Sequence, residues 1–120
     1  MRMLIAGEWL DGTLREDVTN PFDGSVIDTV PVASSAEVER ALEAAVRGAA
    51  RQRHTPAYDR QMILMRAADI ADQRVDDLAR TISLESGKLL AEATGEASRA
   101  GDMLRLAAFE SAVSDRAVAL

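Results

Sequence analysis

Arg99 is the residue whose type and position best suit ligand chemistry in this chain. It lies within a helical pattern, three residues from Glu96 and three residues from Asp102. One interpretation is a surface ion pair with these acids, worth a few tenths of a kcal/mol. A guanidinium can also present two parallel donors to a carboxylate or phosphate. The spacing alone favours the ion pair.

Nucleophilic and metal chemistry have little support. The chain has no cysteine and one histidine, His54, which excludes disulfides and thiolate metal sites. The serines of the helical stretches lie far from His54 in sequence, so no pair of nucleophile and base is indicated. Acidic residues share helix faces and could gather a hard cation, but a solvated acidic face is the favoured interpretation. These acids are Asp69, Asp72 and Asp76, and then Glu92 and Glu96.

Two other cations have positions that favour structural roles. Arg60 lies in the first turn of an expected helix, where a cation opposes the helix dipole, so we expect it to clamp a carboxylate or carbonyls elsewhere. Glu85 is one candidate partner. Lys88 follows the helix-ending Gly87, where its charge suits the carboxyl end of a helix. We therefore assign no catalytic residue, no metal ligand and no cofactor-binding residue in this chain.

Composition narrows the class of partner. The net charge of −6 argues against nucleic acid, because phosphate binding needs a basic surface. No apolar run approaches the length of a membrane span, and acids interrupt the short apolar start, so we expect neither a membrane helix nor a signal peptide. The seven glycines form no G-x-G-x-x-G loop after a strand. The cytoplasm is the expected compartment.

The patterns predict strands first and helices afterwards. Residues 3–10 and 13–19 are expected to form a hairpin through Asp11-Gly12, the dipeptide typical of a two-residue turn, and residues 26–32 a third strand. A capping box at Ser34 and Glu37 starts the first helix, which runs to about Arg51. Thr55 and Pro56 are expected to cap and start a second helix. A third covers residues 75–85, and a fourth runs from about residue 90 to 114.

Small residues dominate the predicted inner face of the fourth helix, which comprises Ala93, Ala97, Ala100, Leu104 and Ala107. Gly95 and Gly101 also lie in its interior, where each costs up to about 1 kcal/mol relative to alanine. We therefore expect another backbone to pass close by. The second helix should bury a stripe of apolar residues, namely Ile63, Leu64, Ala67, Ile70 and Ala71.

Four landmarks in order resemble the amino-terminal segment of the aldehyde dehydrogenase superfamily. The first two are Gly7-Glu8-Trp9 and the turn Asn20-Pro21-Phe22-Asp23-Gly24. The others are Arg60 ahead of Ile63-Leu64, and Glu85-Ser86-Gly87-Lys88 leading to Glu92 and Glu96. The resemblance runs from about Leu4 to about Ala112.

The resemblance implies an α/β fold in the full enzyme, with this chain supplying only its opening part. Residues 1–33 would be N-terminal strands, residues 34–115 a helical layer of the dinucleotide-binding domain, and residues 116–120 a truncated end. The implied activity is oxidation of an aldehyde to an acid or thioester with NAD or NADP, in a homo-oligomer. Because the family uses a cysteine nucleophile, the catalytic residues would lie outside this chain, and the isolated chain is expected to be inactive.

The resemblance also gives Arg99 a sharper role. In the family this long helix passes the mouth of the substrate tunnel, and members acting on phosphorylated or phosphonate aldehydes place an arginine in the matching region. The resemblance therefore points to the branch of the family that acts on small anionic aldehydes. Arg99 would then bind the anionic end of the aldehyde. The contrasting hypothesis is a non-enzymatic helical adaptor or oligomerisation module, which should cover its own apolar faces.

Overall fold

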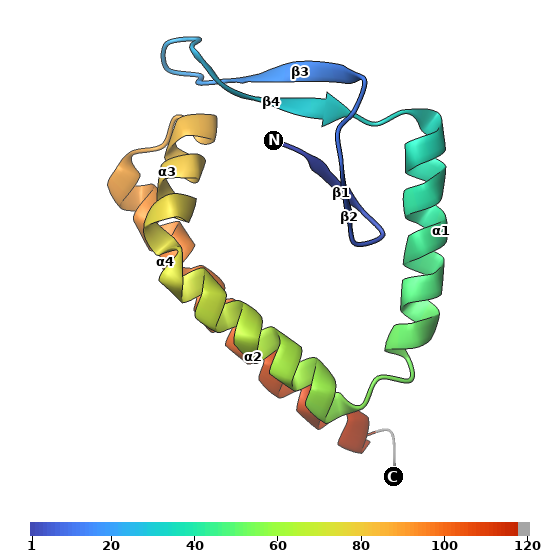
Figure 1. The fold of residues 1–120 in the computed structure, drawn as a ribbon. Helices are drawn as coiled ribbons and strands as arrows, with labels where there is room; N and C mark the ends of the chain where they lie inside the picture. The colour runs from blue at the N-terminus through green and yellow to red at the C-terminus, as the bar shows by residue number, and fades with distance from the viewer. Residues whose placement is uncertain (118–120) are drawn as a thin grey trace. The chain divides into compact units, whose positions relative to one another are not determined.

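Residues 1–117 form four short strands followed by four helices (Figure 1). The computed structural model describes residues 1–117, with the side chains of residues 1–112. The chain divides into two compact units, Met1–His54 and Thr55–Leu120. The predicted order of strands before helices is confirmed, and α1 belongs to the same compact unit as the strands. No helix among the described residues is long and apolar enough to span a bilayer.

The first hairpin turns earlier than the sequence suggested. Strands β1 (Met3–Ile5) and β2 (Glu8–Leu10) pair antiparallel, with Ile5 opposite Glu8. The two turn residues, Ala6 and Gly7, have φ values of 55° and 86°. Positive φ at both central positions suits the right-handed twist of a tight hairpin. The prediction of one strand over residues 3–10 was therefore wrong, because Ala-Gly makes the turn where Asp-Gly was expected to.

The second hairpin pairs two strands that the sequence had assigned differently. Strand β3 (Leu14–Thr19) pairs antiparallel with β4 (Val26–Val32), from Leu14 opposite Val32 to Thr19 opposite Val26. The structure thus has two hairpins rather than one hairpin and a third strand. Gly12 has a steric role, since a Cβ there would lie 2.7 Å from the Cβ of Pro31. The predicted turn at residues 20–24 is confirmed, and the Asn20 side chain accepts from the Phe22 amide at 3.0 Å.

Helix α1 (Ser35–Gln52) begins as predicted. Ser34 Oγ accepts from the Glu37 amide at 3.3 Å, and Glu37 Oε2 accepts from the Ser34 amide at 2.7 Å. This reciprocal pair satisfies two donors that the first turn leaves without intrahelical partners. The Arg40 guanidinium also pairs with the Glu8 carboxylate, which joins α1 to β2.

Helix α2 begins after a proline, and helix α3 ends at a glycine. Helix α2 (Ala57–Gln73) has Pro56 as its N-cap residue and no side-chain cap, so the prediction of Thr55 as the cap was wrong. Helix α3 (Val75–Ser86) ends at Gly87 in the left-handed conformation, with φ 69°, as predicted. A residue with no Cβ adopts that conformation without steric cost.

Helix α4 (Leu90–Ala117) packs along α2 and α3 through small side chains (Figure 1). Ala93 and Ala97 join Ala79 of α3 in one buried cluster, while Ala68 of α2 and Ala108 of α4 are also fully buried. The part of the predicted end segment at residues 118–120 lies outside the described residues. The stripe predicted for α2 was partly wrong, since Ile63 and Ile70 are 61% and 48% exposed. Ala107, which was expected on the inner face of α4, is exposed as well.

Gly101 of α4 lies against the Asp72 side chain of α2. A Cβ placed there would lie 1.9 Å from Asp72 Oδ1 and 3.0 Å from an Arg105 Nη atom. A Cβ at Gly95 would meet nothing within 4 Å among the described residues. Gly101 therefore has a close neighbour, but this neighbour is the Asp72 side chain rather than the backbone that the sequence predicted, and the structure shows no close neighbour at Gly95.

Large apolar side chains remain exposed in both units. On α1, Val38, Leu42 and Val46 form an apolar stripe of which each residue is about half exposed or more. No large side chain among the described residues is fully buried. Alanines, which each bury little area, therefore supply most of the core.

The strained turn residue gives a direct stability prediction. Asparagine tolerates the left-handed conformation better than alanine, so Ala6→Asn should raise the free energy of unfolding by about 1 kcal/mol. Urea denaturation of the chain measures the change. Ala33→Asn, at an exposed position without positive φ, is the matched control and should change little. A loss of stability in Ala6→Asn would show that the turn does not adopt this conformation.

The two interior glycines of α4 should respond differently to alanine. Gly95→Ala should stabilise the chain by up to about 1 kcal/mol, because it removes a helix-interior glycine without a clash. Gly101→Ala should show no such gain, since its methyl group would displace Asp72 from Arg105. Adding Asp72→Ala should restore the gain, and urea denaturation compares the variants. Equal gains at both glycines would contradict the close approach at Gly101.

Candidate anion-binding site on helix α4

Arg99 lies in the middle of α4 with an exposed side chain. The sequence offered Glu96 and Asp102 as its ion-pair partners, yet the structure pairs both acids with other cations. Glu96 Oε2 lies 2.6 Å from Lys88 Nζ, and Asp102 Oδ1 lies 3.8 Å from an Arg105 Nη atom. No ion pair of Arg99 occurs within 4.0 Å in the part of the chain whose side chains are described. The guanidinium is thus presented to solvent beside two acids that are already paired.

The Lys88 ammonium pairs with the Glu96 carboxylate of α4. Its side chain and that of Glu96 are each 45% exposed, so water screens the pair. The Lys88 carbonyl accepts from Ser83 Oγ at 2.8 Å, which ties the loop back to α3. The expected position after the helix-ending glycine is confirmed, and the partner that the sequence did not indicate is Glu96.

The pairing changes the acidity of Glu96. The hydrogen bond from the Lys88 ammonium, together with its charge, holds the pKa of Glu96 below its usual value of 4.5. The charge of Arg99 contributes in the same direction to a smaller degree. Glu96 is therefore within electrostatic reach of both cations, although its hydrogen bond is with Lys88.

Arg105 explains the acidic face that had suggested a cation site. One Nη atom of Arg105 lies 2.5 Å from Asp72 Oδ2 and 3.3 Å from Asp69 Oδ1, across the junction of α4 and α2. These carboxylates hold the pKa of Arg105 above its usual value, chiefly through the hydrogen bond that the Arg105 guanidinium donates to Asp72. Among the described residues, no three side chains of the metal-binding types gather to hold a metal ion.

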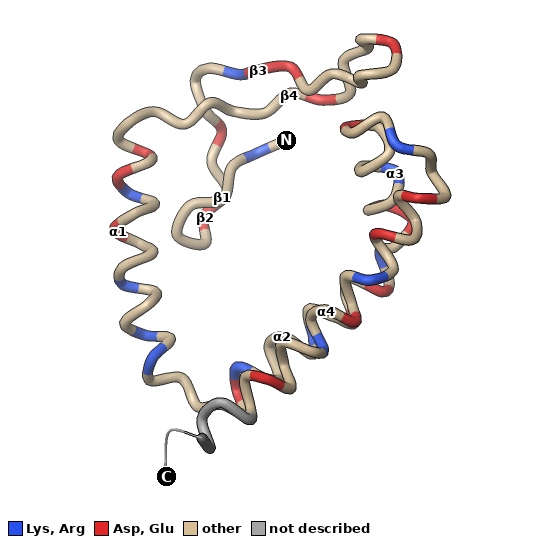
Figure 2. The backbone as a smooth tube through the Cα atoms, turned by 180° about the vertical axis from the view of Figure 1, so that it is seen from behind, with Lys and Arg blue, Asp and Glu red and all other residues tan. Residues whose placement is uncertain are grey.

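Sequence reasoning missed Arg105. The sequence did contain a signal for a cation, because Asp69 and Asp72 share a helix face, where a nearby positive charge would stabilise their carboxylates. The cation could not be identified from spacing along one helix, since Arg105 lies 33 residues beyond Asp72 in sequence. Basic and acidic residues both occur along the helices (Figure 2).

Arg60 acts as a clamp, as expected. Its Nη1 donates to the Thr55 carbonyl at 2.5 Å, and its Nε donates to Ser111 Oγ at 3.4 Å. The guanidinium thereby joins the start of α2 to the last turns of α4. Glu85, the partner suggested by the sequence, is not one of these two groups.

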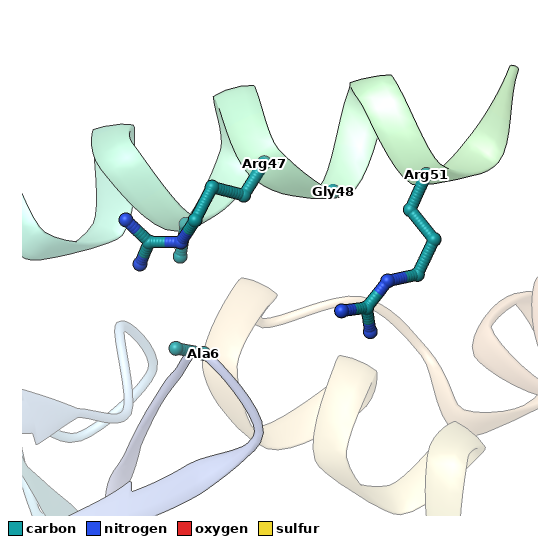
Figure 3. A pocket seen from close by; sticks show the side chains of 5 residues that line it. Ala6, Arg47, Gly48 and Arg51 are labelled. Carbon is teal, nitrogen blue, oxygen red and sulfur yellow. The ribbon is translucent and has the colours of Figure 1, made fainter.

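A shallow hollow of about 390 Å³ lies between α1 and the β1–β2 turn (Figure 3). Arg47 and Arg51 lie on either side of Gly48, with Ala6 opposite them. Arg47 is already paired with Glu43 at 3.5 Å, four residues earlier on α1. The small residues let the strained turn approach the helix, so packing alone accounts for this hollow.

Comparison with known proteins identifies the family. Residues 9–118 match the description "Aldehyde dehydrogenase family", which covers most of the chain. The chain belongs to the aldehyde dehydrogenase family.

The relatives are similar over one part of their length. The chain is 42% identical to a succinate-semialdehyde dehydrogenase (NADP(+)) of Escherichia coli over 84% of this chain and 21% of that protein. It is also 42% identical to a glutarate-semialdehyde dehydrogenase of Pseudomonas putida, over 83% of this chain and 21% of that protein. The chain therefore spans about a fifth of the length of the curated relatives it matches.

Solved aldehyde dehydrogenase structures share this fold. A NAD-dependent benzaldehyde dehydrogenase from Corynebacterium glutamicum superposes with a TM-score of 0.85 at 32% identity, over 92% of this chain and 25% of that one. The predicted resemblance and fold class are thus confirmed.

The described part of this aldehyde dehydrogenase chain does not fit a dinucleotide. A phosphate cradle needs glycine-rich backbone leading from a strand into a helix amino terminus. Gly7 and Gly24 instead lie in the turns of hairpins, and Gly87 ends a helix. No cofactor contact is therefore assigned to these residues.

The Lys88–Glu96 pair should make local stability depend on pH. Because the pKa of Glu96 is lower in the folded chain than unfolded, the pair stabilises the folded state above the usual glutamate pKa. That contribution is lost as the pH falls through the lowered pKa. A carbon-detected NMR titration should give Glu96 a midpoint below 4.5, the usual value for glutamate.

Variants of Lys88 test the cause of this shift. Lys88→Gln should raise the Glu96 midpoint toward the usual value, whereas Lys88→Arg should keep it low. An unchanged midpoint in Lys88→Gln would contradict the pairing.

Proposed function

We propose that this chain is the amino-terminal segment of an NAD(P)-dependent aldehyde dehydrogenase that oxidises a small anionic aldehyde to an acid or thioester. Two relatives named above are dehydrogenases of succinate and glutarate semialdehyde, and a third, from Bacillus cytotoxicus, is named malonate-semialdehyde dehydrogenase and is 36% identical. Each of these aldehydes carries a carboxylate at its far end. The names support a substrate class and leave the individual aldehyde and the choice of NAD or NADP open.

Arg99 is the residue we propose for binding the anionic end of the substrate. The observation that carries this role is its exposed guanidinium, whose two acidic neighbours on α4 are paired elsewhere. A carboxylate can accept two parallel hydrogen bonds from that planar group. The aldehyde carbon at the other end of the substrate would then be held toward catalytic residues in another part of the enzyme.

The chemistry itself is proposed to lie outside this chain. The sequence has no cysteine to form a covalent adduct with the aldehyde. The contribution of residues 1–120 is then structural support and recognition of the substrate anion within a cytoplasmic homo-oligomer. The apolar stripe Val38, Leu42 and Val46 supports a scaffold that packs on further protein, because an independent adaptor would cover such a face.

The role of Arg99 predicts a selective loss of activity. In the full-length enzyme, Arg99→Ala should lower kcat/KM for succinate semialdehyde about 10- to 100-fold, because charge-assisted hydrogen bonds are lost. Pentanal, a neutral aldehyde of similar length, should be oxidised about as well as by the unaltered enzyme. Steady-state kinetics with both aldehydes measure the ratio.

Two further variants sharpen this test. Arg99→Lys keeps the charge without the planar fork and should give an intermediate loss. Arg66→Ala removes an exposed arginine of α2 and should leave the ratio unchanged. Equal losses on both aldehydes in Arg99→Ala would show a structural role and remove the basis for anion recognition by this residue.

A further inference from the structure

The corner between α3 and α4 holds Lys88 in a defined place. Gly87 turns the backbone at φ 69°, and the Lys88 carbonyl then accepts from Ser83 Oγ at 2.8 Å. Ser86 Oγ donates to the Ile82 carbonyl at 2.5 Å, which fixes the residue before the turn. The Lys88 amide lies 3.4 Å from the same hydroxyl. Three local hydrogen bonds thus fix the backbone from which the Lys88 side chain extends along α4.

From this corner the ammonium reaches Glu96, which lies one helical turn before Arg99. The distance from Lys88 Nζ to Glu96 Oε2 is 2.6 Å. Residues three apart on a helix are neighbours, so the Glu96 carboxylate could pair with either cation. In the structure it pairs with Lys88.

The other acidic neighbour of Arg99 is held in the same way. Asp102 pairs with Arg105, which is anchored to Asp72 of α2 at 2.5 Å. The other two positions three or four residues from Arg99 are occupied by Gly95 and Met103, which carry no charge. The net charge presented around Arg99 therefore depends on whether its two acids have other partners.

We propose that Lys88 is a positioning residue for recognition of the anionic aldehyde, which acts by holding the Glu96 carboxylate away from Arg99. This inference rests on the proposed function, because it concerns the same arginine. Without Lys88, Glu96 pairs with Arg99 and repels the substrate carboxylate. Lys88 then sets substrate preference without touching the substrate.

The test is a set of variants in the full-length enzyme. Lys88→Gln should raise KM for succinate semialdehyde about two- to fivefold, the effect expected for one exposed ion pair, with little change in kcat. KM for pentanal should stay the same. Adding Glu96→Gln should restore KM for succinate semialdehyde, because the competing carboxylate is gone. Lys88→Arg should behave like the unaltered enzyme.

A purely structural role of Lys88 gives a different result. If Lys88 only stabilises the α3–α4 corner, Lys88→Gln would lower kcat for both aldehydes, and adding Glu96→Gln would not restore kcat. That result would overturn the inference. A KM for succinate semialdehyde that Lys88→Gln leaves unchanged would overturn it as well. Thermal unfolding of each variant shows whether a change in kcat follows a loss of folded protein.

Arg99→Ala, measured beside these variants, separates the two proposals. If Arg99→Ala is selective for the anionic aldehyde and Lys88→Gln is not, only the role of Lys88 fails. If Arg99→Ala is not selective, the proposed recognition by Arg99 fails and the role of Lys88 fails with it.

Discussion

The close packing of α4 on α2 and α3 is the constraint on which the second unit depends. Its fully buried contacts are made by alanines, which each bury little area, and larger side chains of α3 pack partly buried against them. At Gly101 the packing leaves no room for a Cβ, so the Asp72 carboxylate fills that space and reaches Arg105. Steric closeness thereby creates the ion network at the edge of the interface, and the network in turn occupies Asp102.

Local signals in the sequence predicted the features that depend on neighbouring residues. The capping box at Ser34, the left-handed Gly87 and the turn after Asn20 are each determined within a few residues. The family also followed from short landmarks in a fixed order. Pairing between strands was harder, because Asp-Gly is the stronger turn signal and the positive φ of Ala6 has no such signal.

Tertiary contacts account for the remaining differences. The stripe of α2 was placed partly on the wrong side, because Ile63 and Ile70 are more apolar than the alanines that face α4. The ion pairs of Arg105 with Asp69 and Asp72 were not predicted, because these partners lie on another helix. Arg99 was singled out from the sequence, whereas the cations that pair with its two acidic neighbours, Lys88 and Arg105, are shown by the structure alone.

How strongly a charged side chain attracts a ligand depends on the charges beside it as well as on the side chain itself. An arginine between two acids on a helix is normally neutralised by them, which lowers its attraction for a ligand. Here each acid has a competing cation whose backbone is fixed, Lys88 by the α3–α4 corner and Arg105 by the helix packing. The packing of α4 on α2 therefore occupies one acidic neighbour of Arg99, Asp102, and the α3–α4 corner occupies the other, Glu96.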